Sequence, residues 1–206
     1  MEGQQELSKK EKREIKRQVQ ESQLSIEKRK VKMGRFLKWI IAFAIIAIAI
    51  GAFFYFSSNS APDSQDLSIA YEILERAHVP RPEAVTNYNS NPPTSGNHWS
   101  DASAPIARGA HDTEFPDEAL VHNLEHGEIW ISYRPGIDES VKEELKSIVE
   151  DSYKTVLTPR SKNDTDIAVA AWGRLDKFNL EGKPLDRQRI EDFIKRYRNK
   201  GPELVP

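Results

Sequence analysis

The sequence predicts one α+β domain, in which a small sheet is packed by helices, preceded by a single transmembrane helix. An apolar run over residues 36–56 is long enough to cross a bilayer, and its last 18 residues, Trp39–Phe56, carry no charge. Beyond residue 117, segments with helical periodicity alternate with short segments rich in β-branched and aromatic residues. That mixed order is typical of helices layered on a sheet.

The apolar run divides the charges of the chain unevenly. Residues 1–38 carry 12 Lys or Arg against 6 Asp or Glu, whereas residues 57–206 carry 18 against 26. The first cation after the run is Arg76. Because basic residues stay on the cytoplasmic side of a membrane, we predict a cytoplasmic N-terminus and a large C-terminal part outside the plasma membrane.

These features define four segments. We predict a basic cytoplasmic tail at 1–35, a transmembrane helix at 36–56, a polar linker at 57–67 and an extracytoplasmic α+β domain at 68–206. A cleaved signal peptide is the alternative, but the apolar run is longer than the usual hydrophobic region of such a peptide and about 35 polar residues precede it. We therefore prefer an uncleaved signal-anchor and a single-pass membrane protein.

The composition excludes several classes of site. The chain contains no cysteine, so disulfides, cysteine zinc fingers and cysteine nucleophiles are excluded, and imidazole and carboxylate remain as the strong metal ligands. No aromatic residue interleaves the charges of residues 1–34, and the C-terminal domain is acidic. A nucleic-acid partner is therefore not expected, and no particular protein partner is predicted.

The first half of the domain is predicted to be a helix followed by coil. Apolar residues recur at helical spacing over 69–77, and Pro80 prevents continuation, so His78 is expected at a helix exit. The proline-rich stretch 79–118 lacks periodicity. A second helix is expected from Pro116, which suits a first turn, to Gly127, which suits a terminator.

The second half is predicted to alternate strands and helices. A strand with alternating hydrophobicity is expected at 128–133, and the remaining segments follow from their periodicity: a helix at 139–152, strands at 155–158 and 166–175, and a helix at 186–198.

One short stretch carries recognisable chemistry. His122, Glu125 and His126 follow an H-x-x-E-H pattern, and on a helix residues at i, i+3 and i+4 share one face. In the inverzincin pattern two such histidines hold zinc and the glutamate acts on a water molecule. The structural alternative is an amphipathic helix whose imidazoles only form hydrogen bonds.

All five histidines of the chain are crowded between residues 78 and 126. Besides His122 and His126 they are His78, His98 and His111. His98 follows a stiff Pro92-Pro93 pair and a glycine turn, which suits a rigidly presented imidazole.

Three segments carry a resemblance to a known family, namely YNSNPPTSGNH at 88–98, LVHNLEHG at 120–127 and AWG at 171–173. Over roughly residues 68–180 the chain resembles the domain of unknown function family 3105. Members are typically prokaryotic membrane-anchored proteins with an exported domain, and the family pattern also has histidine at His78. The chain departs from the pattern at Asn97, where proline is expected, and at His111, where an aromatic residue is usual. His111 is therefore the weakest candidate.

We predict a domain that binds zinc or copper through His78, His98, His122 and His126, with Glu125 as a ligand or as an orienting group. An alternative is a zinc metallohydrolase in which Glu125 is the general base, which requires an open position on the metal. A second alternative is a non-catalytic scaffolding or partner-binding domain in which the histidines are structural. A binding role is preferred over an enzymatic one.

Overall fold

The structure, a computed structural model, describes residues 16, 39–41, 43–52, 65–203 and 205. The chain divides into two compact units, Met1–Ser60 and Ala61–Pro206. In the described part of the first unit, residues 39–41 and 43–52 are helical, and no described helix is both long and apolar enough to span a bilayer. Most of the predicted tail and linker lies outside the described residues, as do residues 36–38, 42 and 53–56 of the predicted transmembrane segment.

The second unit is built on a mixed sheet. Its strands lie in the order β1 (Ile69–Ala70), β8 (Arg174–Phe178), β7 (Ile167–Ala171), β5 (Ile129–Tyr133), β6 (Thr155–Pro159) and β4 (Gly109–Ala110). Strands β4, β6 and β5 are parallel to one another, whereas β1, β8, β7 and β5 pair antiparallel. A separate two-stranded parallel ladder joins β2 (His78–Val79) to β3 (His98–Trp99).

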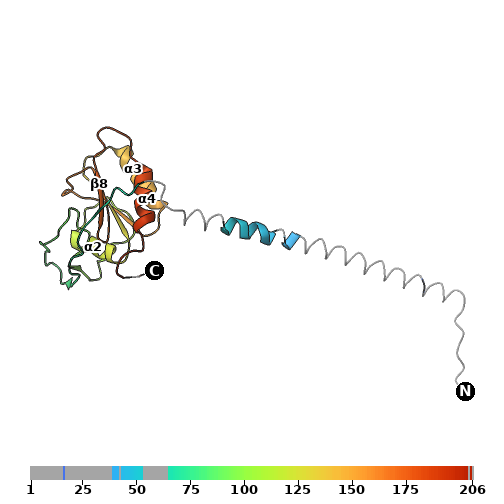
Figure 1. The fold of residues 1–206 in the computed structure, drawn as a ribbon, viewed down its shortest axis with the longest axis horizontal. Helices are drawn as coiled ribbons and strands as arrows, with labels where there is room; N and C mark the ends of the chain where they lie inside the picture. The colour runs from blue at the N-terminus through green and yellow to red at the C-terminus, as the bar shows by residue number, and fades with distance from the viewer. Residues whose placement is uncertain (1–15, 17–38, 42, 53–64, 204, 206) are drawn as a thin grey trace, which may run out of the picture. The chain divides into compact units, whose positions relative to one another are not determined.

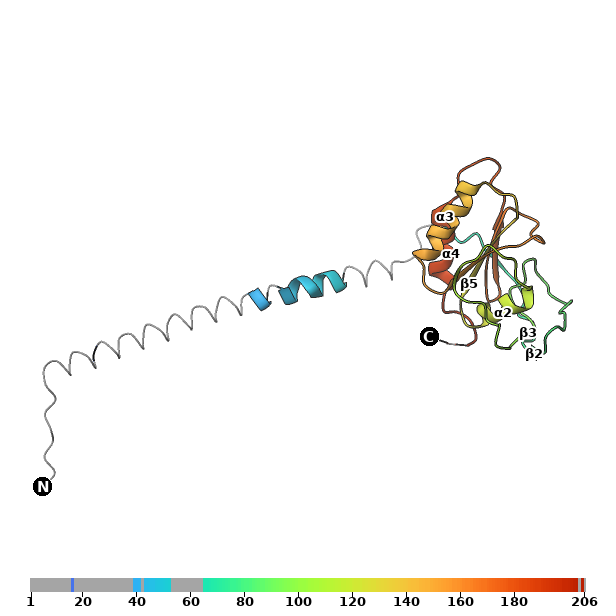
Figure 2. The ribbon, with the colours of Figure 1, turned by 180° about the vertical axis from the view of Figure 1, so that it is seen from behind.

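Helices cover both faces of the sheet, as Figures 1 and 2 show. Helices α3 (Glu139–Glu150) and α4 (Arg187–Tyr197) lie side by side, and their apolar residues pack with Ile129 and Ile131 of the central strand β5. Trp130, between those two isoleucines, points to the opposite face and packs with α2 (Asp117–Glu125). Every residue of β5 is therefore buried, and the predicted α+β class is confirmed.

Most predicted elements of the second half are confirmed within a few residues. The exception is the single strand predicted at 166–175, which is wrong. The structure has two antiparallel strands, β7 and β8, joined by the tight turn Trp172-Gly173. Gly173 has φ +69°, a left-handed conformation that favours glycine, and this turn splits the apolar segment.

The helix predicted over 69–77 is also wrong. Residues 69–70 form the edge strand β1, and the backbone groups that follow bond to distant partners. Tyr71 N–H donates to the Gly173 carbonyl, Leu74 N–H to Ser95 Oγ and Ala77 N–H to Asn97 Oδ1. These long-range acceptors replace the i−4 carbonyls of a helix. His78 consequently lies on the short strand β2 and not at a helix exit.

A buried arginine joins the elements that surround the histidines. Arg160, after β6, donates through Nε and Nη2 to the two carboxylate oxygens of Asp117 at 2.8 and 2.9 Å, and through Nη1 to Asn91 Oδ1 at 2.6 Å. Asp117 begins α2, and Asn91 begins residues 91–97, the proline loop, which leads into His98. This bidentate ion pair therefore fixes the loop that carries His98 against the helix that carries His122.

Replacing Arg160 with Met tests this link. We expect a loss of about 3 kcal/mol in the free energy of unfolding, because the carboxylate of Asp117 loses its buried bidentate partner and keeps only the exposed ammonium group of Lys162 at 3.8 Å. Urea denaturation of both variants provides the measurement. The control, Arg134→Met, removes a 42% exposed arginine 3.5 Å from Asp166 and is expected to cost less than about 1 kcal/mol. Equal losses in the two variants would contradict the assignment.

Candidate metal centre

Helix α2 places His122 and Glu125 on one face. Leu120 and Leu124 are fully buried against Trp130, which turns the neighbouring face toward the proline loop. The helix ends at Glu125, and Gly127, whose φ of +73° favours glycine, turns the chain away from it. The sequence prediction of a helix from Pro116 to a terminating Gly127 is confirmed within two residues.

The proline loop presents His98 from a buried and well-bonded segment. Thr94 and Ser95 are both fully buried, and Tyr88 Oη donates to the Asn97 carbonyl at 2.8 Å. Gly96, with φ +129°, leaves no room for a side chain, because a Cβ there would lie 2.9 Å from the Tyr88 ring. The loop is thus rigid where it delivers the imidazole of His98.

The ladder between β2 and β3 aligns His78 with His98. The two residues are direct register partners, and side chains at paired positions of neighbouring strands lie on the same side. Their ring centroids are 5.0 Å apart. Asn97, where the family pattern suggested proline, contributes to this alignment, since its Oδ1 accepts from the Ala77 backbone at 2.8 Å.

Four side chains converge on one point. One ligand atom from each of His78, His98, His122 and Glu125 lies within 4.8 Å of every other. Oε2 of Glu125 is 2.9 Å from Nε2 of His98 and 3.5 Å from Nε2 of His78. Ligands at 2.0–2.1 Å from a tetrahedral metal are about 3.4 Å apart, so the group has nearly the size of a metal shell.

The ring protons are placed so that lone pairs face this point. Nδ1 of His98 lies 2.8 Å from the Gly96 carbonyl and Nδ1 of His122 lies 2.7 Å from the Trp99 carbonyl. A carbonyl only accepts, so both Nδ1 atoms donate, and in the neutral rings Nε2 carries a lone pair. The His98 lone pair then faces a carboxylate oxygen at 2.9 Å, which is repulsive unless a proton or a metal ion lies between them.

The local electrostatics keep two of these donors in the form that binds metal. Burial lowers the pKa of His122, an effect that the hydrogen bond to the Trp99 carbonyl only partly offsets. Burial alone would raise the pKa of Glu125, but the hydrogen bond from Arg76, the charge that His98 carries when its ring is protonated, and the hydrogen bonds of His78 and His98 outweigh it, so that this pKa is lowered. Near neutral pH the imidazole of His122 is therefore neutral and Glu125 is ionised.

The other two histidines lie outside the group of four. Nε2 of His126 is 3.1 Å from Nε2 of His122 and 3.5 Å from Oε2 of Glu203, so His126 is adjacent to the group. His111 lies apart from it, stacks edge-on against Phe115 and donates through Nε2 to the Ala107 carbonyl at 2.7 Å.

Two residues at the site were missed by sequence reasoning. Arg76 donates to Oε1 of Glu125 at 3.0 Å, and Glu203 of the C-terminal tail lies 3.7 Å from Arg76. Arg76 was assigned to a helix that does not form. Glu203 follows the last periodic segment, where Gly201-Pro202 indicates only a turn.

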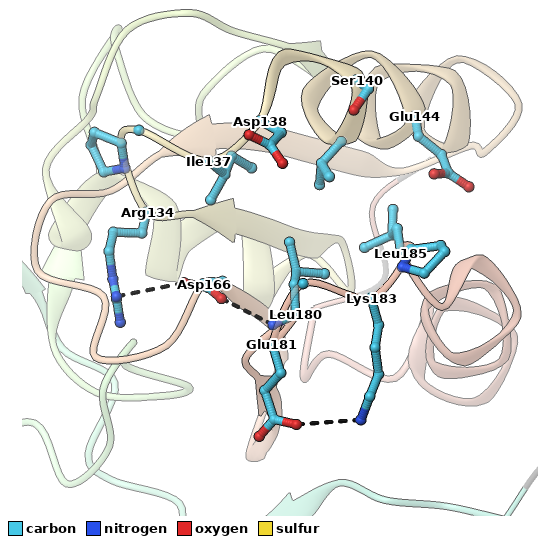
Figure 3. Close-up of a pocket in the computed structure, with 15 residues that line it drawn as sticks. Arg134, Ile137, Asp138, Ser140, Glu144, Asp166, Leu180, Glu181, Lys183 and Leu185 are labelled. Atoms are coloured by element: carbon cyan, nitrogen blue, oxygen red, sulfur yellow. Dashed lines mark hydrogen bonds and ion pairs between the residues drawn. The ribbon is translucent and has the colours of Figure 1, made fainter.

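A cavity of about 630 Å³ lies at the opposite end of β5, where the chain enters α3 (Figure 3). Ile137, Leu180 and Leu185 supply apolar walls, and the charged side chains there include the pairs Arg134 with Asp166 and Lys183 with Glu181. None of the predicted site residues lines this cavity. Ligand chemistry, rather than volume, therefore locates the candidate site at the histidines.

The fold and the site define an α+β domain with a largely buried cluster of three histidines and one glutamate, whose ligand atoms lie close enough together to hold a metal ion. A family model described as "Protein of unknown function (DUF3105)" matches residues 78–205, and the chain belongs to this family. The match begins later than the expected coverage of 68–180 and extends through α4 and the tail. No curated protein and no solved structure is significantly similar to the chain.

Replacing Gly201 with Ala tests the packing of the tail on the site. A Cβ there would lie 2.2 Å from the Glu125 carbonyl oxygen and 2.3 Å from the Gly127 nitrogen, so the tail must shift. We expect the free energy of unfolding, measured with urea, to fall by about 1–3 kcal/mol. The exposed neighbour Pro202, replaced by Ala, serves as the control and is expected to cost less than about 1 kcal/mol. Unchanged stability in Gly201→Ala would refute this packing.

Proposed function

We propose that the domain binds one transition-metal ion, zinc or copper, through His78, His98, His122 and Glu125. The observation that carries the proposal is the convergence of three imidazoles on a carboxylate oxygen, with Nδ1 of His98 and of His122 donating to backbone carbonyls. Such carbonyl contacts are the usual means by which a protein orients histidine ligands. Three imidazoles and a carboxylate suit Zn(II) and Cu(II).

The geometry favours binding over hydrolysis. A general base requires a pKa near the working pH, whereas the pKa of Glu125 is lowered. Its Oε1 accepts from Arg76, its Oε2 lies 2.9 Å from Nε2 of His98 inside the group, and its side chain is 1% exposed. These contacts suit a ligand better than a group that must reach a water molecule.

A purely structural role for the histidines is supported less well. A structural histidine pairs its ring nitrogen with a complementary partner, as Nε2 of His111 does with the Ala107 carbonyl. At His98 the second nitrogen instead faces a carboxylate within a group of four donors, three of which are buried. Desolvating such a group is costly unless a cation compensates it.

Metal analysis of the fragment 61–206, made without a histidine tag, tests the proposal. This unit contains both hydrophobic clusters of the domain and is therefore expected to fold alone. We expect about one zinc or copper ion per chain by mass spectrometry. His78→Gln should weaken binding by at least about 100-fold, more than the loss of an orienting group usually costs.

The matched control is His111→Gln, which changes a histidine outside the group and should bind as the unchanged fragment does. His78 is half-exposed, so its replacement leaves the core intact. A folded fragment that takes up neither Zn(II) nor Cu(II) would eliminate the proposal.

We further propose that segment 36–56 anchors the domain outside the plasma membrane, with residues 1–35 in the cytoplasm. The uncharged run and the basic residues on its amino side support this arrangement. In intact expressing cells, external protease is expected to remove the C-terminal domain from a protein that stays in the membrane fraction after alkaline washing. A protein that washes off, or a domain protected until the cells are lysed, would count against the anchor.

A further inference from the structure

The C-terminal tail places a carboxylate beside the histidine group. Asn199 N–H donates to the Gly127 carbonyl at 2.8 Å, and Glu203 N–H donates to the Glu125 carbonyl at 3.0 Å. Lys154 Nζ donates to the carbonyls of His126 and Val205 and so holds the tail at a further point. Backbone contacts therefore place the segment that carries Glu203 beside the histidine group.

His78 is itself 50% exposed, but exposure increases stepwise from the buried members of the group of four toward Glu203. The side chains of His98 and Glu125 are 0% and 1% exposed, that of His126 is 15% exposed and that of Glu203 is 44% exposed. His126 lies between the buried donors and Glu203. Its Nε2 is 3.1 Å from Nε2 of His122 and 3.5 Å from Oε2 of Glu203. A path of potential ligands thus leads from solvent to the buried donors.

The spacing along this path fits metal coordination. Two ligands bound at about 2.0–2.2 Å to one ion lie roughly 3–3.5 Å apart, and both distances from His126 fall in this range. His122 has only Nε2 to offer, since its Nδ1 donates to the Trp99 carbonyl. One lone pair binds one ion at a time, so His122 serves either the buried donors or His126 and Glu203.

Building on the proposed function, we propose that His126 and Glu203, together with His122, form an outer subsite through which a divalent metal ion passes to and from the four inner donors. His122 is the ligand common to both positions. The carboxylate of Glu203 attracts the cation, and Arg76, which lies 3.0 Å from Glu125 and 3.7 Å from Glu203, holds the two carboxylates close together.

A subsite on the path changes rates and leaves the final complex unchanged. Co(II) serves as the probe, because its absorption reports the ligands around it. We expect Glu203→Gln in the fragment 61–206 to slow both Co(II) uptake and its removal by excess EDTA about tenfold, since an attracting charge is lost. Stopped-flow absorption gives both rates, while the dissociation constant and the final spectrum stay as in the unchanged fragment.

Two further variants sharpen the test. His126→Gln should slow both rates as well, and adding it to Glu203→Gln should slow them less than the product of the single effects, because both residues act on one step. The control, Glu181→Gln, removes a 70% exposed carboxylate that lines the cavity at the other end of β5 and should leave the rates unchanged.

The possible outcomes separate this inference from the proposed function. Unchanged rates in Glu203→Gln would overturn the outer subsite and leave metal binding at the inner donors intact. A changed spectrum with weaker equilibrium binding would make Glu203 an inner ligand, which also overturns it. Failure of the unchanged fragment to bind any Co(II), Zn(II) or Cu(II) would remove the proposed function, and the outer subsite with it.

Discussion

The contact on which the site depends is that between Nε2 of His98 and Oε2 of Glu125. Two acceptor atoms 2.9 Å apart and shielded from water repel each other unless positive charge lies between them. Nδ1 of His98 donates a hydrogen bond to the Gly96 carbonyl, and Arg76 donates to the other carboxylate oxygen of Glu125. The surrounding structure thus holds Nε2 of His98 against the carboxylate of Glu125, an arrangement that a proton or a metal ion stabilises.

Three separate tertiary interactions hold this contact in place. The ion pair between Arg160 and Asp117 joins the proline loop to α2, and the β2–β3 ladder aligns His78 with His98. The tail, through Gly201, packs on the last turn of α2. Each interaction links segments far apart in the sequence, so the four metal-ligand side chains meet only in the folded domain. Metal binding should therefore stabilise the fold as well as the site.

The local part of this structure was predictable from the sequence, and the long-range part was not. Helix α2, with His122 and Glu125 on one face, follows from periodicity and from Gly127, and the crowding of histidines indicated the members of the group. The segment 69–77 has helical spacing but forms edge strand and coil, because its amides bond to Gly173, Ser95 and Asn97. Hydrophobic periodicity cannot predict hydrogen-bond partners that are distant in the sequence. It also could not predict that the C-terminal tail places Glu203 beside His126.

The most direct test of the account is X-ray absorption spectroscopy of the zinc-loaded fragment 61–206. The account predicts a first shell of three imidazole nitrogens and one carboxylate oxygen at about 2.0–2.2 Å. It also predicts loss of one imidazole from that shell when His78 is replaced by Gln. A shell with fewer than two imidazoles, or one that the loss of His78 leaves unchanged, would contradict it.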